Sequence, residues 1–108
     1  MTITRISIDY AVAPQVLADD VNAIAAEGFV AIICNRPDGE EPGQPTAAEI
    51  SAACEKAGLA FHHLPISGMP ISVDVIEEQR RLVNESGGPV LGYCRSGQRS
   101  QLIWQASA

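Results

Sequence analysis

The sequence predicts an α/β fold, with a mainly parallel sheet of four to five strands and helices on both faces. Segments with strand character alternate with segments of helical periodicity four times along the 108 residues. The segment "FVAIIC" is apolar throughout, as expected of a parallel strand covered on both sides. With 46% hydrophobic and 19% charged residues, the composition is that of an ordinary globular protein. A chain of this length builds one core, so we expect residues 1–108 to form a single domain.

The first strand–helix unit is predicted from an alternating segment followed by a helical face. "ITRISI" alternates polar and apolar residues, which is typical of a strand, and Pro14 suits the first turn of the helix that follows. Gly28 is expected to end this helix. Its inward face is predicted to contain Leu17, Val21 and Ile24.

The second unit contains "FVAIIC", an irregular Pro- and Gly-rich segment over residues 35–45, and a helix. Thr46 and Glu49 form a predicted capping box at the start of that helix, and Gly58 is expected to end it. Its apolar face is predicted to contain Ala47, Ile50, Cys54 and Ala57.

The third and fourth units repeat the order. "LAFHHL" is a predicted strand that stops at Pro65, residues 65–71 are irregular, and Ser72 is the expected cap of a helix that ends at "SGG". "PVLGY" is the fourth strand, and the last helix follows with Trp104 in its core-facing side. The inward positions of the third helix are predicted to be Val75, Ile76, Gln79, Leu82 and Val83.

Charge and hydropathy exclude several classes of partner. A net charge of −6 argues against nucleic acid or an anionic membrane surface as the main partner. No apolar run is long enough to cross a bilayer, and "MTITRISIDY" lacks the continuous apolar segment of a signal peptide. Three cysteines, an odd number, do not suggest a disulfide framework. We therefore expect a cytoplasmic protein with reduced thiols.

The segment "GYCRSGQRS" is the strongest candidate for a catalytic site. Ligands of open α/β sheets bind beyond the carboxyl ends of the strands, where the irregular segments 35–45, 65–71 and 94–99 are expected. A strand, a short polar loop and a helix start direct backbone N–H groups at one point and so form an anion nest. Cys94 begins this loop, and Arg99 can bind an oxyanion through two parallel hydrogen bonds. The remaining loop residues are Arg95, Ser96, Gly97, Gln98 and Ser100.

A catalytic role for Cys94 requires its pKa to be lowered. Lowering the pKa of a thiol from ~8.5 to ~6 raises the thiolate fraction at neutral pH to roughly 90%. Helix N–H groups and Arg99 are the expected cause, Gly97 gives the backbone the necessary freedom, and the hydroxyl of Ser96 or Ser100 could donate to the sulfur. The catalytic interpretation requires that the sulfur be accessible and that the Arg99 guanidinium face the loop. The alternative is a structural turn in which Cys94 is a small core residue.

Four further residues are candidates for a supporting role. Arg36, Asp38 or Glu40 is expected to orient the loop arginines or to contact the acceptor thiol. The side chain of Arg95 is expected to point outward to a carboxylate such as Asp38 or Glu40. Asp38 also fits a structural Pro-Asp-Gly turn. His63 is expected to pack or to bond a neighbouring loop.

Neither a metal nor a cofactor is predicted. His62 and His63 are neighbours on a strand and project to opposite faces, so they cannot bind one ion together. Cys54 is expected in the core. Cys34 ends a strand on the same edge as the site and is considered as a resolving thiol for Cys94, although the sequence does not fix the distance between them.

The cysteine segment also carries a family resemblance. "CRSGQRS" resembles the rhodanese loop C-R-x-G-x-R, and "NRPDGEEPGQP", "FHHLPI" and "GPVLGYCRSGQRS", in this order, resemble the phosphatase-like domain of Blh-type beta-lactamase-hydrolase-like proteins. The resemblance implies a fold similar to that of cysteine-dependent dual-specificity phosphatases. It also implies sulfur transfer as the activity and a persulfide dioxygenase as a partner.

Two departures from the phosphatase pattern favour sulfur transfer. Cys94 and Arg99 are separated by four residues, whereas the phosphatases that this fold resembles have one more, and "PISGMPIS" has no aspartate to act as a general acid. We therefore expect a rhodanese-like sulfurtransferase that passes sulfur from thiosulfate or a persulfide through Cys94 to a thiol acceptor. The alternatives are a phosphatase with a shortened anion loop and a non-catalytic module that binds an anion or a partner.

Overall fold

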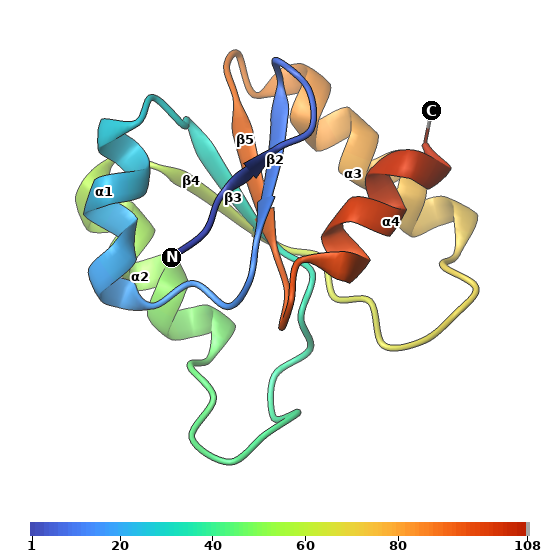
Figure 1. The fold of residues 1–108 in the computed structure, drawn as a ribbon, viewed down its shortest axis with the longest axis horizontal. Helices are drawn as coiled ribbons and strands as arrows, with labels where there is room; N and C mark the ends of the chain where they lie inside the picture. The colour runs from blue at the N-terminus through green and yellow to red at the C-terminus, as the bar shows by residue number, and fades with distance from the viewer. Residues whose placement is uncertain (108) are drawn as a thin grey trace.

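A five-stranded sheet with helices on both faces forms the computed structural model, which describes residues 1–107 (Figure 1). The strand order is β1-β2-β5-β3-β4, and all neighbours are parallel except β1 and β2. The fold class predicted from the sequence is therefore confirmed. The strands are β1 (Thr4–Arg5), β2 (Tyr10–Ala13), β3 (Ala31–Cys34), β4 (Ala60–His63) and β5 (Val90–Tyr93). The helices are the 3-10 turn η1 (Ala18–Asp20), α1 (Val21–Ala26), α2 (Ala47–Ala57), α3 (Val73–Glu85) and α4 (Gln98–Ala106).

The start of the chain differs from the prediction. The first parallel strand is β2, whose four residues are all buried, whereas "ITRISI" contributes only the exposed two-residue edge strand β1. An alternating segment fits an edge exposed to water, and the apolar "YAVA" fits the covered interior. The predicted inward position of Leu17 is also wrong, because the chain enters η1 with Val16 buried and Leu17 half exposed.

The two faces of the sheet carry different helices. Figure 1 shows α1 and α2 on one side and α3 and α4 on the other. Successive strand residues point to opposite faces, so Ile32 packs toward α1 and α2 while Ile33 packs on the side of α3 and α4. The core layer on the side of α1 and α2 also contains Val21, Ile24, Ile50, Cys54, Leu91 and Tyr93. The core layer on the side of α3 and α4 contains Tyr10, Val12, Leu82, Val83, Val90 and Trp104.

The predicted helix ends are largely confirmed. The Thr46 hydroxyl accepts a hydrogen bond from the Glu49 amide at 3.2 Å, and the Ser72 hydroxyl accepts one from the Val75 amide at 3.3 Å. Gly58 ends α2 with a φ of 80°, a conformation that favours glycine. The reciprocal bond of a capping box, from the Thr46 amide to the Glu49 carboxylate, is not among the hydrogen bonds of residues 1–107.

The parallel register brings three connecting segments to one edge. Tyr93 pairs with both Ala13 and Cys34, and Cys34 pairs with His63, so β2, β3, β4 and β5 end together. The segments that follow β3, β4 and β5 gather at the lower edge in Figure 1. In the described part of the chain, no helix has the length and hydropathy needed to span a membrane.

Candidate active site

The cysteine loop connects the central strand β5 to α4 at the carboxyl edge of the sheet. Gly97 precedes the first residue of α4 with a φ of 94°, and its amide donates to the Cys94 Sγ at 3.1 Å. A Cβ at this position would also lie 3.4 Å from the carbonyl oxygen of Ala13. The strained backbone and the close neighbouring strand together explain why a glycine stands here.

The loop lowers the pKa of Cys94. Burial of the thiol raises its pKa, but hydrogen bonds from backbone amides outweigh this effect, so the pKa falls below its ordinary value. The amides are those of Ser100, Ser96, Gly97 and Arg99. Burial raises the pKa of Cys54 to about 11 and also raises that of Cys34. Cys94 therefore differs from the other two cysteines in the direction expected of a nucleophile.

The expectation of an accessible sulfur is not met in this structure. Cys94 is fully buried, with 0% of its surface exposed. In this structure neighbouring residues cover the sulfur, and it is not exposed to solvent.

Arg99 lies next to the loop and is held there by a carboxylate. Its two terminal nitrogens each lie 2.8 Å from an oxygen of Glu40, and one of them also donates to the carbonyl of Ile66 at 3.0 Å. The nearby Cys94 is among the causes that raise the pKa of Arg99, after Glu40 itself. The predicted two-bond recognition by Arg99 is thus present, but with an internal carboxylate as the partner.

Glu40 connects Arg99 to the segment after β3. Hydrogen bonds from Arg99 and Arg36 hold the pKa of Glu40 at about 2, so this carboxylate stays ionised at neutral pH. The buried Arg36 donates from Nε to Glu40 at 2.9 Å and also reaches Glu41 and Gln15. Glu40 therefore contacts Arg99 directly and Arg36 contacts Glu40, which is the arrangement that their predicted supporting role requires.

Arg95 and Asp38 have partners other than those predicted. Arg95 points outward as predicted, but its Nε pairs with Glu41 at 2.9 Å. Asp38 accepts a hydrogen bond from the Ala47 amide at 2.8 Å and so caps α2, and no hydrogen bond among the described residues joins it to Arg95 or Arg99. Residues 38 and 41 lie at different points of the same turn-rich segment, and spacing alone could not tell which carboxylate faces the cysteine loop.

His63 holds this same segment. Its Nε2 lies 3.0 Å from the carbonyl oxygen of Arg36, as the sequence predicts for a contact with a neighbouring loop. The Cys34 thiol donates to that carbonyl at 3.3 Å. Within residues 1–107, no three His, Cys, Asp or Glu side chains are placed to hold a metal ion.

The hydroxyl groups of the loop do not donate to the sulfur, contrary to the prediction. The Ser96 hydroxyl accepts from the Gln98 amide at 3.3 Å, and the Ser100 hydroxyl donates to the Asn35 Oδ1 at 2.8 Å. Their backbone N–H groups are among the causes that lower the pKa of Cys94. Gln98 is exposed and lines a shallow cavity of about 330 Å³ with Ser96 and Gly97.

Three buried polar residues beside the loop were not predicted as site residues. Asn35 bonds Gln79, Gln79 bonds the Tyr10 hydroxyl, and that hydroxyl donates to the carbonyl of Ser100, each at 2.8 Å. The one available signal was polarity in an apolar context, because Asn35 follows "FVAIIC" directly and Gln79 occupies the inward face of its helix.

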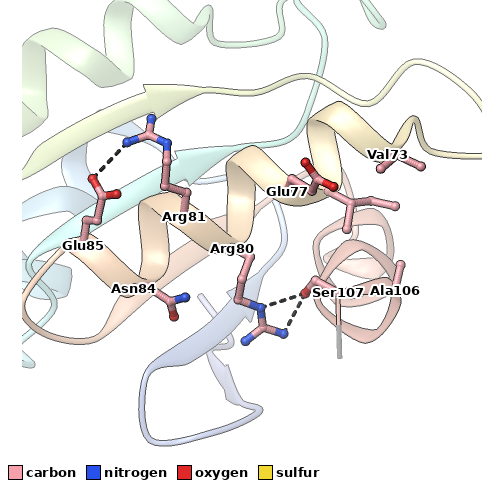
Figure 2. Close-up of a pocket in the computed structure, with 9 residues that line it drawn as sticks. Val73, Glu77, Arg80, Arg81, Asn84, Glu85, Ala106 and Ser107 are labelled. Atoms are coloured by element: carbon pink, nitrogen blue, oxygen red, sulfur yellow. Dashed lines mark hydrogen bonds and ion pairs between the residues drawn. The ribbon is translucent and has the colours of Figure 1, made fainter.

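The largest cavity lies away from the cysteine loop. It has a volume of about 590 Å³ and opens between α3 and α4, where Arg80 donates to the Ser107 hydroxyl (Figure 2). Its lining residues come from α3 and the end of α4, and none of them belongs to residues 94–100. None of the site residues predicted from the sequence lines this cavity.

The sequence of the chain, including this site, matches a known family over nearly its whole length. Residues 2–108 match the family described as "Beta-lactamase hydrolase-like protein, phosphatase-like domain". The chain belongs to this family. A beta-lactamase hydrolase-like protein of Agrobacterium fabrum is 35% identical over 104 residues, which are 96% of this chain and 24% of the relative. The chain thus spans about a quarter of the length of that curated relative.

Solved structures show where the fold of this phosphatase-like domain recurs. A candidate phosphatase from Neisseria meningitidis is 40% identical with a TM-score of 0.88, covering 96% of this chain and 74% of that one. TpbA of P. aeruginosa, solved in complex with pTyr, shares the fold at 16% identity with a TM-score of 0.70, over 94% of this chain and 58% of its own. The fold of the domain is therefore that of cysteine phosphatases. These similarities favour the phosphatase alternative over the predicted sulfur transfer, which has no support among them.

Proposed function

We propose that this phosphatase-like domain is a cysteine-dependent phosphatase for phosphate esters with good leaving groups. The observation that carries the proposal is the loop between β5 and α4, in which the Gly97 amide donates to the Cys94 Sγ at 3.1 Å and the pKa of Cys94 is lowered by backbone N–H groups, beside the Arg99 guanidinium. This arrangement favours a thiolate and supplies donors for the oxygens of a tetrahedral anion. The family match and the phosphatase neighbours support the same choice.

The reaction proceeds in two displacements on phosphorus. The Cys94 thiolate attacks phosphorus and forms an S–P bond while the ester P–O bond breaks. The electron pair of the P–O bond leaves with the departing oxyanion. Water then attacks phosphorus, the S–P bond breaks, and inorganic phosphate and the thiolate are released. Arg99 and the loop amides stabilise the charge on the phosphoryl oxygens in both steps.

The choice of leaving group follows from the lack of an acid. Residues 65–72, the segment after β4, contain neither aspartate nor glutamate. Glu40 is the carboxylate that pairs with Arg99, and its pKa of about 2 leaves it without a proton to donate. Aryl phosphates, whose leaving groups are stable without protonation, are therefore the proposed substrates.

Sulfur transfer is the second candidate, and the same lack of an acid favours it. The Cys94 thiolate would attack the outer sulfur of thiosulfate, the S–S bond would break, and sulfite would leave with the electron pair. An acceptor thiolate would then attack the outer sulfur of the Cys94 persulfide and release the Cys94 thiolate. The donor anion, the thiol acceptor and a persulfide dioxygenase as partner belong to this candidate.

A pair of turnover assays separates the candidates. The wild-type chain, Cys94→Ser and the core control Cys54→Ala are compared for hydrolysis of an aryl phosphate and for thiocyanate formation from thiosulfate and cyanide. We expect aryl phosphate hydrolysis that Cys94→Ser abolishes and Cys54→Ala retains. Thiocyanate formation without hydrolysis would select the second candidate. Hydrolysis that survives Cys94→Ser would refute the mechanism, and no turnover of either substrate would leave a binding module.

A further inference from the structure

We propose that Tyr10, Asn35 and Gln79 are positioning residues for the cysteine loop, which they hold through both polar groups of Ser100. The inference rests on Cys94 as the reactive thiol of the proposed function, but it does not depend on which group that thiol transfers. None of the three side chains is placed among the groups that contact a substrate.

The three side chains and Ser100 form a closed ring of hydrogen bonds, each 2.8 Å long. The Ser100 hydroxyl donates to Asn35 Oδ1, and Asn35 Nδ2 donates to Gln79 Oε1. Gln79 Nε2 donates to the Tyr10 hydroxyl, which in turn donates to the Ser100 carbonyl. The four bonds run in a single direction around the ring, and Asn35 Nδ2 also donates to the Leu64 carbonyl outside it at 3.0 Å.

The ring is buried and draws on four separate parts of the fold. Asn35, Gln79 and Ser100 are each 0% exposed, and Tyr10 is 1% exposed. Tyr10 lies in β2, Asn35 in the segment after β3, Gln79 in α3 and Ser100 in α4. Because a buried polar group without a partner is costly, the loss of one member leaves the others unsatisfied. The first turn of α4 is therefore tied to three other elements at one residue.

Packing fixes Tyr10 independently of the ring. Its aromatic ring stacks on that of Trp104, with 4.5 Å between the ring centroids and 6° between the ring planes. The Arg80 guanidinium lies over the Trp104 ring, 3.7 Å from the ring centroid. Gly92 leaves room for the Tyr10 hydroxyl, because a Cβ there would lie 2.9 Å from Cζ. The hydroxyl thus meets Ser100 in a position set by the surrounding side chains.

Ser100 connects the ring to the thiolate. It lies in the first turn of α4, which begins directly after Gly97, whose amide donates to the Cys94 Sγ at 3.1 Å. The backbone N–H of Ser100 is also among the groups that lower the pKa of Cys94. The hydroxyl and carbonyl of the same residue are the two groups that the ring holds. The other titratable groups that act on Cys94 or respond to it are Arg99 on α4, Tyr10 on β2 and Cys34 on β3.

The test compares two tyrosine variants of the full chain. Tyr10→Phe removes the hydroxyl from the ring, whereas Tyr93→Phe removes a buried hydroxyl that packs on the opposite face and has no hydrogen-bond partner among the described residues. The rate of alkylation of Cys94 by iodoacetamide is measured across pH by peptide mass spectrometry. We expect Tyr10→Phe to raise the apparent pKa of Cys94 by about one unit, which is roughly a tenfold loss of thiolate below that pKa. Tyr93→Phe, although adjacent to Cys94, is expected to leave it unchanged.

A second pair of variants tests the ring from Ser100 itself. Ser100→Ala keeps the amide but removes the donor to Asn35, and Ser100→Thr restores a hydroxyl. The proposal expects a raised Cys94 pKa in the first and the wild-type value in the second, and this pair decides the question if Tyr10→Phe does not fold. An unchanged pKa in folded Tyr10→Phe or folded Ser100→Ala, or an equal shift in Tyr93→Phe, would overturn it. Because the readout is alkylation, a chain inactive on both substrates can still show the predicted shifts.

Discussion

The substitution Gly92→Ala puts a methyl group into the most crowded of the glycine positions in the described part of the chain. Gly92 lies in the middle of β5, and a Cβ there would overlap the Tyr10 hydroxyl and lie 2.9 Å from Cζ and 3.2 Å from Cε1. The backbone of Gly92 is not in the left-handed region, so the expected cost comes from the contact alone. Tyr10 must move, and it is held by Trp104 and by two hydrogen bonds.

The free energy of unfolding is expected to fall by about 2–4 kcal/mol. Overpacking a filled core costs about 1–3 kcal/mol. Displacement of Tyr10 weakens its bonds to Ser100 and Gln79, each worth about 1 kcal/mol. For a domain of this size, such a loss lowers the Tm by at least about 8 °C.

Urea unfolding of Gly92→Ala and of the control Gly68→Ala measures this cost. A Cβ at Gly68 would have no atom within 4 Å, so its substitution is expected to change the free energy of unfolding by less than about 0.5 kcal/mol. Tyr10→Phe removes the closest atom, so Gly92→Ala should cost less in that background, and the two changes should not be additive. Equal costs for the two glycine variants would refute the close packing of Tyr10 against β5.

Three further predictions concern charge and helix capping. Lysine in place of Arg99 cannot form two parallel hydrogen bonds, so Arg99→Lys should lower kcat/KM for the aryl phosphate by about a hundredfold or more. The control Arg95→Lys, at an exposed position, should keep kcat/KM within a few-fold of the wild-type value. Equal losses in the two variants would contradict the roles given to the two arginines. The pKa of Glu40 is lowered from 4.5 to about 2, so its stabilising contribution is present above 4.5 and is lost as the pH falls toward 2. Urea midpoints across this range should therefore fall less steeply for Glu40→Gln than for wild type, and parallel curves would count against the ion pair. Thr46→Ala should lower the free energy of unfolding by about 1 kcal/mol in the same assay, and no change would argue against the cap.

The local patterns of the chain were sufficient to predict most of the fold. The apolar "FVAIIC", the cap at Thr46 and the turn at Gly58 each act over a few residues, and each was predicted correctly. The prediction of the first parallel strand failed because "ITRISI" and "YAVA" are neighbours in the sequence and both suit a strand. The choice between them depends on which one the rest of the sheet covers, and that is a tertiary property.

The cysteine loop and its neighbours Arg36, Glu40 and His63 were predicted from the sequence, but the ring of buried polar side chains was not. Cys94, Gly97 and Arg99 lie within six residues and carry a recognisable pattern, so their proximity follows from the sequence. The ring does not, because its bonds join residues 44, 65, 69 and 90 positions apart. The reaction was also left open, since one anion loop serves phosphoryl and sulfur transfer alike and the leaving group decides between them.

The most direct test of the account is the ionisation of Cys94 in the wild-type chain. Alkylation of all three cysteines is followed across pH in one sample, with the peptides of Cys34 and Cys54 as internal comparisons. The account predicts that Cys94 reacts with a midpoint below the ordinary thiol value of ~8.5, while the other two react only at higher pH. A midpoint for Cys94 at or above that value, or a Cys94 that stays unreactive when the other two react, would contradict it.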